Sequence, residues 1–448
     1  MSVRALAEQF PAAALLQGER VRDMAKLVVE GLHKLNGEAV IHGAKNSALP
    51  ILAATILSGD VSEISNCPRL SDVAATQAIL RHLGCRVEEG DGRVLVDSSG
   101  MCRSDIPDSL MREMRSSIVF LGAIAARTGQ AQLSFPGGCE LGPRPINLHL
   151  AALRRLGLEI EEERGRLNCR ARGRLRGTAI TLEQPSVGAT ENILMASATA
   201  QGTTVIVNAA REPEIVDLCA YLNACGARIT GAGEGTVVIE GVDRLTGCRH
   251  EVIPDRIETV TYMAATAVTG GRVRLLRTDP DNIASVIPAF EEAGCRVEGT
   301  GEGSGSGGSL ILEAPARLNR VKSVLTMPYP GFPTDAQAPI MAMTCTASGT
   351  SLFVETIFDS RYRHVDELSR MGARIKVEGR VAVVEGVERL SGAPVECTDL
   401  RGGAALVIAA LAAEGETEIG ELRHLDRGYE GLEAGLSGLG AAICRIGG

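Results

Sequence analysis

The chain has 448 residues, a length that suggests about three domains. Its formal net charge of −9 argues against a nucleic-acid-binding protein, which is expected to have a basic surface, and means that an anionic substrate must be bound by a local cluster of cations. With no Trp, 5 Tyr and 7 Phe, the core must be built mainly from Ala, Val, Ile and Leu, which favours closely packed helices and strands.

The N-terminal segment does not resemble a signal peptide, because Glu8, Gln9 and Pro11 interrupt its apolar residues. The longest apolar runs, such as residues 404–413, are far shorter than the ~20 residues that span a bilayer. The 12 cysteines include no Cys-x-x-Cys pair and no Cys/His spacing typical of zinc sites. We therefore expect a cytoplasmic protein without membrane insertion or a metal site, with mostly buried, reduced cysteines and with residues 1–24 as a disordered extension.

Along the rest of the chain, two glycine-containing signals each occur six times, at intervals of about 70 residues. The first is a glycine that follows an Ala-rich apolar segment, at Gly59, Gly129, Gly202, Gly270, Gly349 and Gly415. The second is the glycine of the pattern small or apolar residue, Gly, any, any, Val or Ile, at Gly84, Gly157, Gly226, Gly294, Gly372 and Gly440. Because the two registers agree, they indicate a sixfold internal repeat.

Each repeat predicts the same order of elements. An Ala-rich helix ends at the first glycine and is followed by a short strand; a second helix ends at the second glycine, and a strand or hairpin closes the repeat. Because one β-α-β-α-β-β unit cannot bury its own apolar faces, we expect three units to share a core and six units to form two similar domains. The apolar helices predict an α/β fold with the helices inside and the sheets around them.

Charged and polar residues gather at the predicted helix starts. The Ala-rich helices begin, in chain order, with GAKNSA, EMRSS, PSVGATEN, PDRIET, FPTDAQ and TDLRGG. The second helices follow loops that contain Arg69, Cys139 and Arg144, Arg211 and Glu212, Asp279, Arg361 and Arg363, and Asp426 and Arg427. Taken singly, each acid can be a helix N-cap and each Arg a surface salt bridge. Their recurrence beside helix N-termini, which favour anions, predicts a strongly anionic ligand held between two domains.

The motifs that carry a resemblance to a known family are GAKNSALP, MRSSI, PGGCELGPRP, PSVGAT, NAAREPEIVD, PDRIET, FPTDAQAP, RYRHVDEL, TDLRGGAALV and LDRGYE. With these motifs, the sequence from about residue 25 to the C-terminus resembles the UDP-N-acetylglucosamine 1-carboxyvinyltransferase family, the enolpyruvyl transferases that open peptidoglycan synthesis. The resemblance implies a two-domain inside-out α/β barrel with three repeated units per domain and a site in the cleft between the domains. Residues 45–253 are then the first domain, with the cysteine loop, and residues 25–44 plus 254–448 the second.

The implied reaction joins two small-molecule substrates, phosphoenolpyruvate and UDP-N-acetylglucosamine (UDP-GlcNAc), and releases phosphate; the resemblance implies no metal and no organic cofactor. Its catalytic residues correspond to Cys139, Asp335 and Lys45. By the same resemblance, Cys139 donates a proton to the vinyl carbon of phosphoenolpyruvate and also forms a covalent thioketal adduct. A thiol near cations can serve both purposes, and the glycines around it allow its loop to fold over bound substrate.

The residues that resemble the phosphoenolpyruvate-binding set are Lys45, Asn46, Arg144, Arg361, Arg401 and Arg427. Asp335 corresponds to the residue that contacts the sugar and accepts the proton of its 3′-hydroxyl. A carboxylate among so many cations is expected to have a depressed pKa and to be a weak base, so we rank its binding role above its role as a base.

The residues that resemble the UDP-GlcNAc-binding set are Arg115, Arg144, Pro145, Ile146, Asn147, Leu148, Ser186, Val187, Gly188, Asp335 and Ile357. Two positions depart from the family pattern: Asn147 stands where an Asp is usual, and Gln184 stands where some members have Lys. Both departures affect the expected nucleotide contacts and leave the catalytic residues intact. We expect His149 to have a structural role or to contact the cysteine loop.

Two other functions compete with this interpretation. 5-Enolpyruvylshikimate-3-phosphate synthase shares the fold and the donor, but the cysteine loop and PSVGAT favour the nucleotide-sugar acceptor. A catalytically silent paralogue that binds UDP-GlcNAc and regulates flux has no need of the full set of catalytic and cationic residues present in this sequence.

Overall fold

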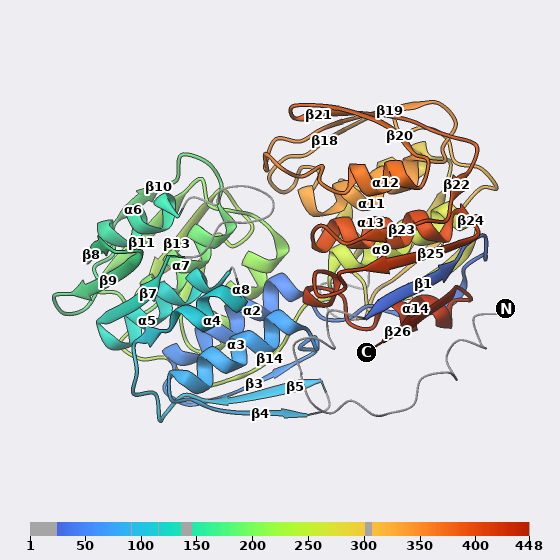
Figure 1. The fold of residues 1–448 in the computed structure, drawn as a ribbon. Coiled ribbons are helices and arrows are strands. Elements are labelled where there is room, and N and C mark those ends of the chain that lie inside the picture. Colours follow the sequence, from blue (N-terminus) through green and yellow to red (C-terminus); the bar gives the residue numbers. More distant parts are fainter. Residues whose placement is uncertain (1–24, 91, 115, 136–145, 301–306, 448) are drawn as a thin grey trace. The chain divides into compact units, whose positions relative to one another are not determined.

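The computed structural model describes residues 25–90, 92–114, 116–135, 146–300 and 307–447 (Figure 1). By their internal contacts, these residues form two compact units. Unit 1 contains the described residues of ranges 25–42 and 254–447, and unit 2 those of ranges 43–135 and 146–253. The predicted extension at residues 1–24 lies outside the described residues. Within the described ranges, none of the helices has the length and apolar character needed to cross a membrane.

The described residues form six four-stranded sheets with one common strand pattern, in which the first two strands are parallel and the other neighbours antiparallel. The sheets of unit 2 are, in order, β14 (Arg249–Glu251), β3 (Val61–Ser65), β5 (Arg93–Asp97) and β4 (Arg86–Gly90); β6 (Asp105–Ile106), β7 (Gln130–Ser134), β9 (Arg166–Ala171) and β8 (Leu158–Glu163); and β10 (Ala179–Thr181), β11 (Thr203–Val207), β13 (Thr236–Glu240) and β12 (Arg228–Thr230).

Two of the three four-stranded sheets of unit 1 combine strands from both of its chain segments, and the sheet that begins with β18 is made by the second segment alone. They are β2 (Asn36–Val40), β15 (Arg272–Leu276), β17 (Ser309–Glu313) and β16 (Arg296–Thr300); β18 (Ser323–Leu325), β19 (Thr350–Val354), β21 (Val381–Glu385) and β20 (Arg374–Glu378); and β23 (Pro394–Glu396), β25 (Glu416–Gly420), β1 (Lys26–Glu30) and β26 (Ala442–Ile446). A short parallel pair, β22 (Leu390–Ser391) and β24 (Ala413–Glu414), adds to them. Since β1 and β2 complete sheets made largely by residues after 270, unit 1 requires both ends of the described chain.

Three apolar helices, α9 (Arg256–Thr269), α11 (Thr334–Thr344) and α13 (Leu400–Leu411), pack against one another in unit 1 (Figure 1). Each also packs on a different four-stranded sheet, α9 on β15 and β17, α11 on β19 and β21, and α13 on β1 and β25. Residues 401–411 of α13 are buried throughout, as expected for a helix that is apolar on every side. The helices therefore lie inside and the sheets around them.

Unit 2 has its own aliphatic core, around α2 (Lys45–Ala54), α5 (Phe120–Thr128) and α7 (Val187–Ser197). The remaining helices are α3 (Ser71–His82), α4 (Asp108–Glu113), α6 (Asn147–Arg155) and α8 (Pro213–Ala224) in unit 2, α10 (Ile287–Glu292), α12 (Val365–Arg370) and α14 (Leu432–Gly438) in unit 1, and the 3-10 turns η2 (Thr55–Leu57), η3 (Ser117–Val119), η4 (Pro280–Ile283) and η5 (Leu425–Arg427).

All twelve glycines of the two sequence signals have a left-handed backbone, with φ between 64° and 108°. Each glycine of the second signal directly follows the C-cap residue of α3, α6, α8, α10, α12 or α14. Its N–H donates to the carbonyl three residues earlier at 2.9–3.0 Å, and in five cases the next N–H donates to the carbonyl five residues earlier, as in a Schellman motif. The glycine pattern therefore marked the ends of these helices correctly.

The first signal marks the start of a strand more often than the end of a helix, which corrects the sequence prediction. Gly129 and Gly270 are C-caps, but α2, α7, α11 and α13 end four or five residues before their glycines. In two of these helices a threonine hydroxyl bonds to a carbonyl of the last turn, Thr55 to Leu52 at 2.6 Å and Thr344 to Met341 at 2.8 Å. Such a bond offers the backbone an alternative to continuing the helix.

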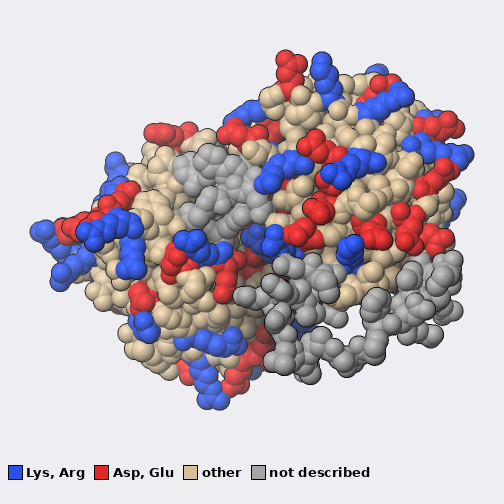
Figure 2. Space-filling model, viewed as in Figure 1, with Lys and Arg blue, Asp and Glu red and all other residues tan. Residues whose placement is uncertain are grey.

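Figure 2 shows that acidic and basic side chains are interspersed on the visible faces, and no broad basic surface stands out there. This distribution agrees with the net charge of −9.

Gly226→Ala and Gly372→Ala are each expected to lower the free energy of unfolding by about 1 kcal/mol. A Cβ atom would meet nothing within 4 Å at either position, so the cost comes from the left-handed backbone alone. Urea unfolding followed by circular dichroism measures the effect. Gly235→Ala is the control, because a Cβ there is equally unobstructed and its φ is not left-handed; an equal loss in all three variants would contradict the explanation.

Glu191→Gln is expected to remove a stability loss that the wild type suffers as pH rises. Burial, and then the charges of Glu214 and Glu212, raise the pKa of Glu191 from 4.5 to about 8 in the fold. As pH rises, Glu191 therefore ionises in the unfolded chain before it ionises in the fold. The free energy of unfolding of the wild type falls as a result between pH 4.5 and about 8. Melting temperatures measured across this range should show the variant gaining over the wild type up to about pH 8; parallel pH profiles would mean that Glu191 is ionised in the fold.

Candidate active site

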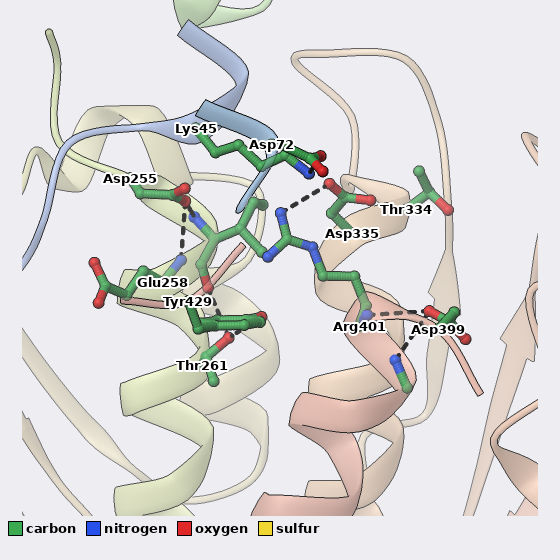
Figure 3. Close-up of polar contacts among 12 residues, drawn as sticks. Lys45, Asp72, Asp255, Glu258, Thr261, Thr334, Asp335, Asp399, Arg401 and Tyr429 are labelled. Atoms are coloured by element: carbon green, nitrogen blue, oxygen red, sulfur yellow. Dashed lines mark hydrogen bonds and ion pairs between the residues drawn. The ribbon is translucent and has the colours of Figure 1, made fainter. Parts of the chain in front are cut away.

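An ion cluster centred on Asp335 lies at the start of α11 in unit 1. Arg401 donates from Nη2 to Oδ2 of Asp335 at 3.2 Å (Figure 3). Arg361 donates from Nη2 to Oδ1 of the same carboxylate at 2.7 Å. Arg361 is only 2% exposed and also donates to the carbonyl of Thr334 at 3.2 and 2.9 Å. Each carboxylate oxygen thus has its own guanidinium partner.

The position of Arg401 is fixed by the first turn of α13 and by an aromatic ring. Asp399 caps this helix, and its Oδ1 accepts the N–H groups of Arg401 and Gly402 at 3.0 Å each. The guanidinium carbon lies 5.3 Å from the centre of the Tyr429 ring, whose hydroxyl is 2.9 Å from that of Thr261. The cation is buried and held on several sides.

The Arg401 guanidinium retains unused hydrogen-bonding capacity. Its Nε and Nη1 atoms are buried and have no hydrogen-bond partner among the described residues. An unsatisfied buried cation is costly, and an anion supplied by a ligand would remove that cost. This part of unit 1 is therefore suited to bind an anionic group.

The same cluster determines the charge of Asp335. Burial alone would raise the pKa of Asp335, but the charges of Arg401, Arg361 and Arg256 outweigh burial and hold the pKa well below its usual range. The carboxylate is consequently ionised at neutral pH and, in this arrangement, is a weak base, as expected from the sequence.

The segment that carries Ile357 is tied to α11 by a buried acid. Glu355 accepts the N–H groups of Ile357 and Phe358 through Oε1, at 2.8 and 3.0 Å, and the hydroxyl of Thr334 through Oε2, at 3.0 Å. The Ile357 side chain remains 37% exposed, although it is apolar. Glu355 was not predicted as a site residue, because its only distinguishing feature in the sequence is its position directly after a strand.

Arg427 lies in η5 and is partly exposed. Its neighbour Asp426 accepts two hydrogen bonds from Arg445, at 3.0 and 2.6 Å, and Arg445 also donates to Glu433 at 2.7 Å. These bonds hold the turn that presents Arg427.

In unit 2, the first residue of α2 is Lys45, whose Nζ lies 2.6 Å from Oδ2 of Asp72 in the first turn of α3. Both side chains are buried, and the partly exposed Asn46 follows Lys45. Asp72 was not among the predicted site residues. An acid in a first helical turn is typical of favourable charge–dipole contacts, so nothing in the pattern singled out Asp72.

A second buried acid is hydrogen-bonded to the start of α2. Asp217 of α8 accepts a hydrogen bond from the hydroxyl of Ser47 and one from the N–H of Ile253 at 3.2 Å, both at Oδ2. Its Oδ1 lies 2.8 Å from Nε2 of His250. Asp217 thereby links the start of α2, which carries Lys45 and Asn46, to β14 and to Ile253 at the end of unit 2.

The described parts of the two predicted nucleotide-binding segments lie side by side. A Cβ atom on Gly188 would be 2.8 Å from Cε1 of His149, so the start of α7 lies directly against α6. Nδ1 of His149 is 3.0 Å from Nδ2 of Asn192, and burial lowers the pKa of His149 to about 4. His149 thus joins the start of α6, with Ile146, Asn147 and Leu148, to the start of α7, with Ser186, Val187 and Gly188. The cysteine loop, which is the other contact expected for His149, lies outside the described residues.

Four predicted site residues, Arg115, Cys139, Arg144 and Pro145, lie outside the described residues. Within the described ranges, no three His, Cys, Asp or Glu side chains are grouped so that they could hold a metal ion.

Comparisons with known proteins agree with the resemblance. The model of the EPSP synthase (3-phosphoshikimate 1-carboxyvinyltransferase) family matches residues 29–436. UDP-N-acetylglucosamine 1-carboxyvinyltransferase 2 of Caldanaerobacter subterraneus is 50% identical over 94% of this chain and 100% of its own length. UDP-N-acetylglucosamine 1-carboxyvinyltransferase 1 of Symbiobacterium thermophilum is 49% identical over 95% of this chain and 96% of its own.

The fold agrees as well. The crystal structure of the enolpyruvyl transferase NikO from Streptomyces tendae matches with a TM-score of 0.84 and 26% identity, over 94% of this chain and 98% of that one. This match confirms the predicted α/β class. The chain therefore belongs to the EPSP synthase family and, within it, to the UDP-N-acetylglucosamine 1-carboxyvinyltransferases, which are transferase enzymes.

Proposed function

We propose that this enzyme transfers the enolpyruvyl group of phosphoenolpyruvate to the 3′-hydroxyl of UDP-GlcNAc and releases phosphate. In a bacterial cell this is the first committed step of peptidoglycan precursor synthesis, on which cell shape and division depend. Both substrates are small, water-soluble molecules, so we place the enzyme in the cytoplasm, without membrane insertion, nucleic-acid partner, metal or organic cofactor. The observation in the structure that best supports the proposal is the buried Arg401 beside Asp335, because two nitrogen atoms of Arg401 have no hydrogen-bond partner among the described residues.

The fold proposed for this activity is the six-unit inside-out barrel. Six sheets with one strand pattern and twelve left-handed glycines at corresponding places support six related β-α-β-α-β-β units, three per domain. We assign residues 45–253 to one domain and residues 25–44 plus 254–448 to the other, with residues from both binding the substrates.

The proposed phosphoenolpyruvate site uses Lys45, Asn46, Arg144, Arg401 and Arg427. The Nε and Nη1 donors of Arg401, which have no partner within the described part of the chain, suit a phosphate or carboxylate oxygen, and an Arg can bind such a group through two nitrogens. Lys45 would exchange its contact with Asp72 for the substrate. Arg361 was predicted to belong to the same set, but its bonds to Thr334 and Asp335 favour a role in which it positions Asp335.

In the proposed reaction, the Cys139 thiol gives its proton to C3 of phosphoenolpyruvate while the sugar oxygen bonds to C2. The tetrahedral intermediate then loses a proton from C3 and phosphate from C2, which restores the double bond. Asp335 would bind the 3′-hydroxyl and orient it. Because its pKa is so low, Asp335 can accept the hydroxyl proton only after the substrates weaken its contacts with the arginines, so binding remains its main role.

UDP-GlcNAc would be bound by Arg115, Arg144, Pro145, Ile146, Asn147, Leu148, Ser186, Val187, Gly188, Asp335 and Ile357. The contact between Gly188 and His149 supports one shared nucleotide site in unit 2. The exposed Ile357 offers an apolar surface for the sugar. Asn147 keeps a hydrogen-bonding side chain without the charge of the usual Asp, so a contact to uracil can persist.

Phosphate release from phosphoenolpyruvate tests the proposed reaction. UDP-GlcNAc should support release, and shikimate 3-phosphate, tried separately, should not. Release with shikimate 3-phosphate alone would identify a different acceptor. Absence of release with both, in folded protein that still binds UDP-GlcNAc, would indicate a silent regulatory paralogue.

Cys139→Ser serves as the control for the proton-donor assignment. We expect a loss of roughly 100-fold or more in turnover, since general acid catalysis contributes about that much, with UDP-GlcNAc affinity retained. Turnover like that of the wild type would remove Cys139 from this role.

A further inference from the structure

Two cysteines outside the proposed active site lie in direct contact in unit 2. The Sγ atoms of Cys225 and Cys248 are 3.3 Å apart. Cys225 is the C-cap residue of α8 and is 2% exposed, whereas Cys248 precedes β14 and is partly exposed. They are separated by a hairpin and a loop in the sequence, so the fold brings them together.

Backbone hydrogen bonds hold both cysteines in place. The carbonyl of Cys225 accepts the N–H of Thr246 at 2.9 Å and its hydroxyl at 3.3 Å. The carbonyl of Cys248 accepts the N–H of Glu63 in β3 at 2.9 Å. The two thiols thus face each other from the C-terminal end of α8 and from the segment that leads into the β14–β3 pairing.

The two thiols differ in reactivity. The S–H of Cys225 can donate to Cys248, and this hydrogen bond lowers the pKa of Cys248 although burial opposes it. The same hydrogen bond, followed by burial, raises the pKa of Cys225. The more exposed sulfur is therefore the better thiolate, and the buried sulfur lies within reach to resolve an oxidised partner.

We propose that Cys225 and Cys248 form an oxidant-responsive dithiol that a peroxide converts into an intramolecular disulfide. The Cys248 thiolate attacks one peroxide oxygen, the O–O bond breaks, and hydroxide leaves, which yields a sulfenic acid on Cys248. The Cys225 sulfur then attacks this sulfur; the S–O bond breaks, and the proton of Cys225 leaves with the hydroxyl group as water. The dithiol loses two electrons and the peroxide gains them.

The disulfide would fasten the end of α8 to the segment that leads into β14. That segment continues to His250 and Ile253, both held by Asp217, which also bonds to Ser47 at the start of α2. Oxidation would thus add a covalent link beside the network that positions Lys45 and Asn46.

Peptide mapping of the full-length protein tests the proposal. The native protein is treated with hydrogen peroxide, its remaining thiols are alkylated in denaturant, and it is digested with trypsin. Cleavage after Arg211, Arg228, Arg244 and Arg249 places Cys225 in residues 212–228 and Cys248 in residues 245–249. We expect these peptides to be joined, with a mass about 2 Da below the sum of the two reduced peptides, and to be separated again by dithiothreitol.

Cys219 lies in the same tryptic peptide as Cys225, so variants distinguish them. Cys219→Ala should still form the linked peptide, and Cys225→Ala should not. Activity is not a suitable readout, because peroxide can also oxidise the proposed catalytic Cys139. Recovery of both thiols in reduced form, oxidation of Cys248 to a sulfinic acid with Cys225 still reduced, or linkage through Cys219 would overturn the proposal.

Discussion

A buried arginine with incomplete hydrogen bonding is the constraint on which the candidate site in unit 1 depends. Arg401 is balanced by Asp335 on one nitrogen and lies over Tyr429, yet Nε and Nη1 lack partners among the described residues. A buried ion pair alone does not ensure stability, because the cost of desolvation offsets the attraction. Such an arrangement is better explained by ligand binding than by stability.

The fold makes this arrangement possible by packing three apolar helices together inside the sheets. The helices α9, α11 and α13 contact one another, and their first residues carry Arg256, Asp335 and Arg401. Arg256 and Arg401, together with Arg361, act on the carboxylate of Asp335. The apolar residues along these helices form the core of the unit, whereas the three charged residues lie in the first turn of each helix.

Local patterns allowed the sequence to predict the glycine-terminated second helices, the α/β class and the starts of five of the six Ala-rich helices. The sixth, expected at EMRSS, begins only at Phe120, after the 3-10 turn η3. The partners of the site residues could not be predicted in this way. Asp217 meets Ser47, and Asn192 meets His149, only because the fold joins segments that are far apart in the chain. Two of the four early helix ends were missed because a threonine side-chain bond, such as that of Thr55, competes locally with the backbone pattern.

The most direct test is a calorimetric titration of phosphoenolpyruvate, in the presence of UDP-GlcNAc, into the wild type and Arg401→Lys. Lysine keeps the charge but loses the directed Nε and Nη1 donors. Affinity should fall at least tenfold, since a charged hydrogen bond contributes about 2 kcal/mol, while the same change at the exposed Arg423 should have no effect. Wild-type affinity in Arg401→Lys would contradict the assignment of Arg401 to the anion site.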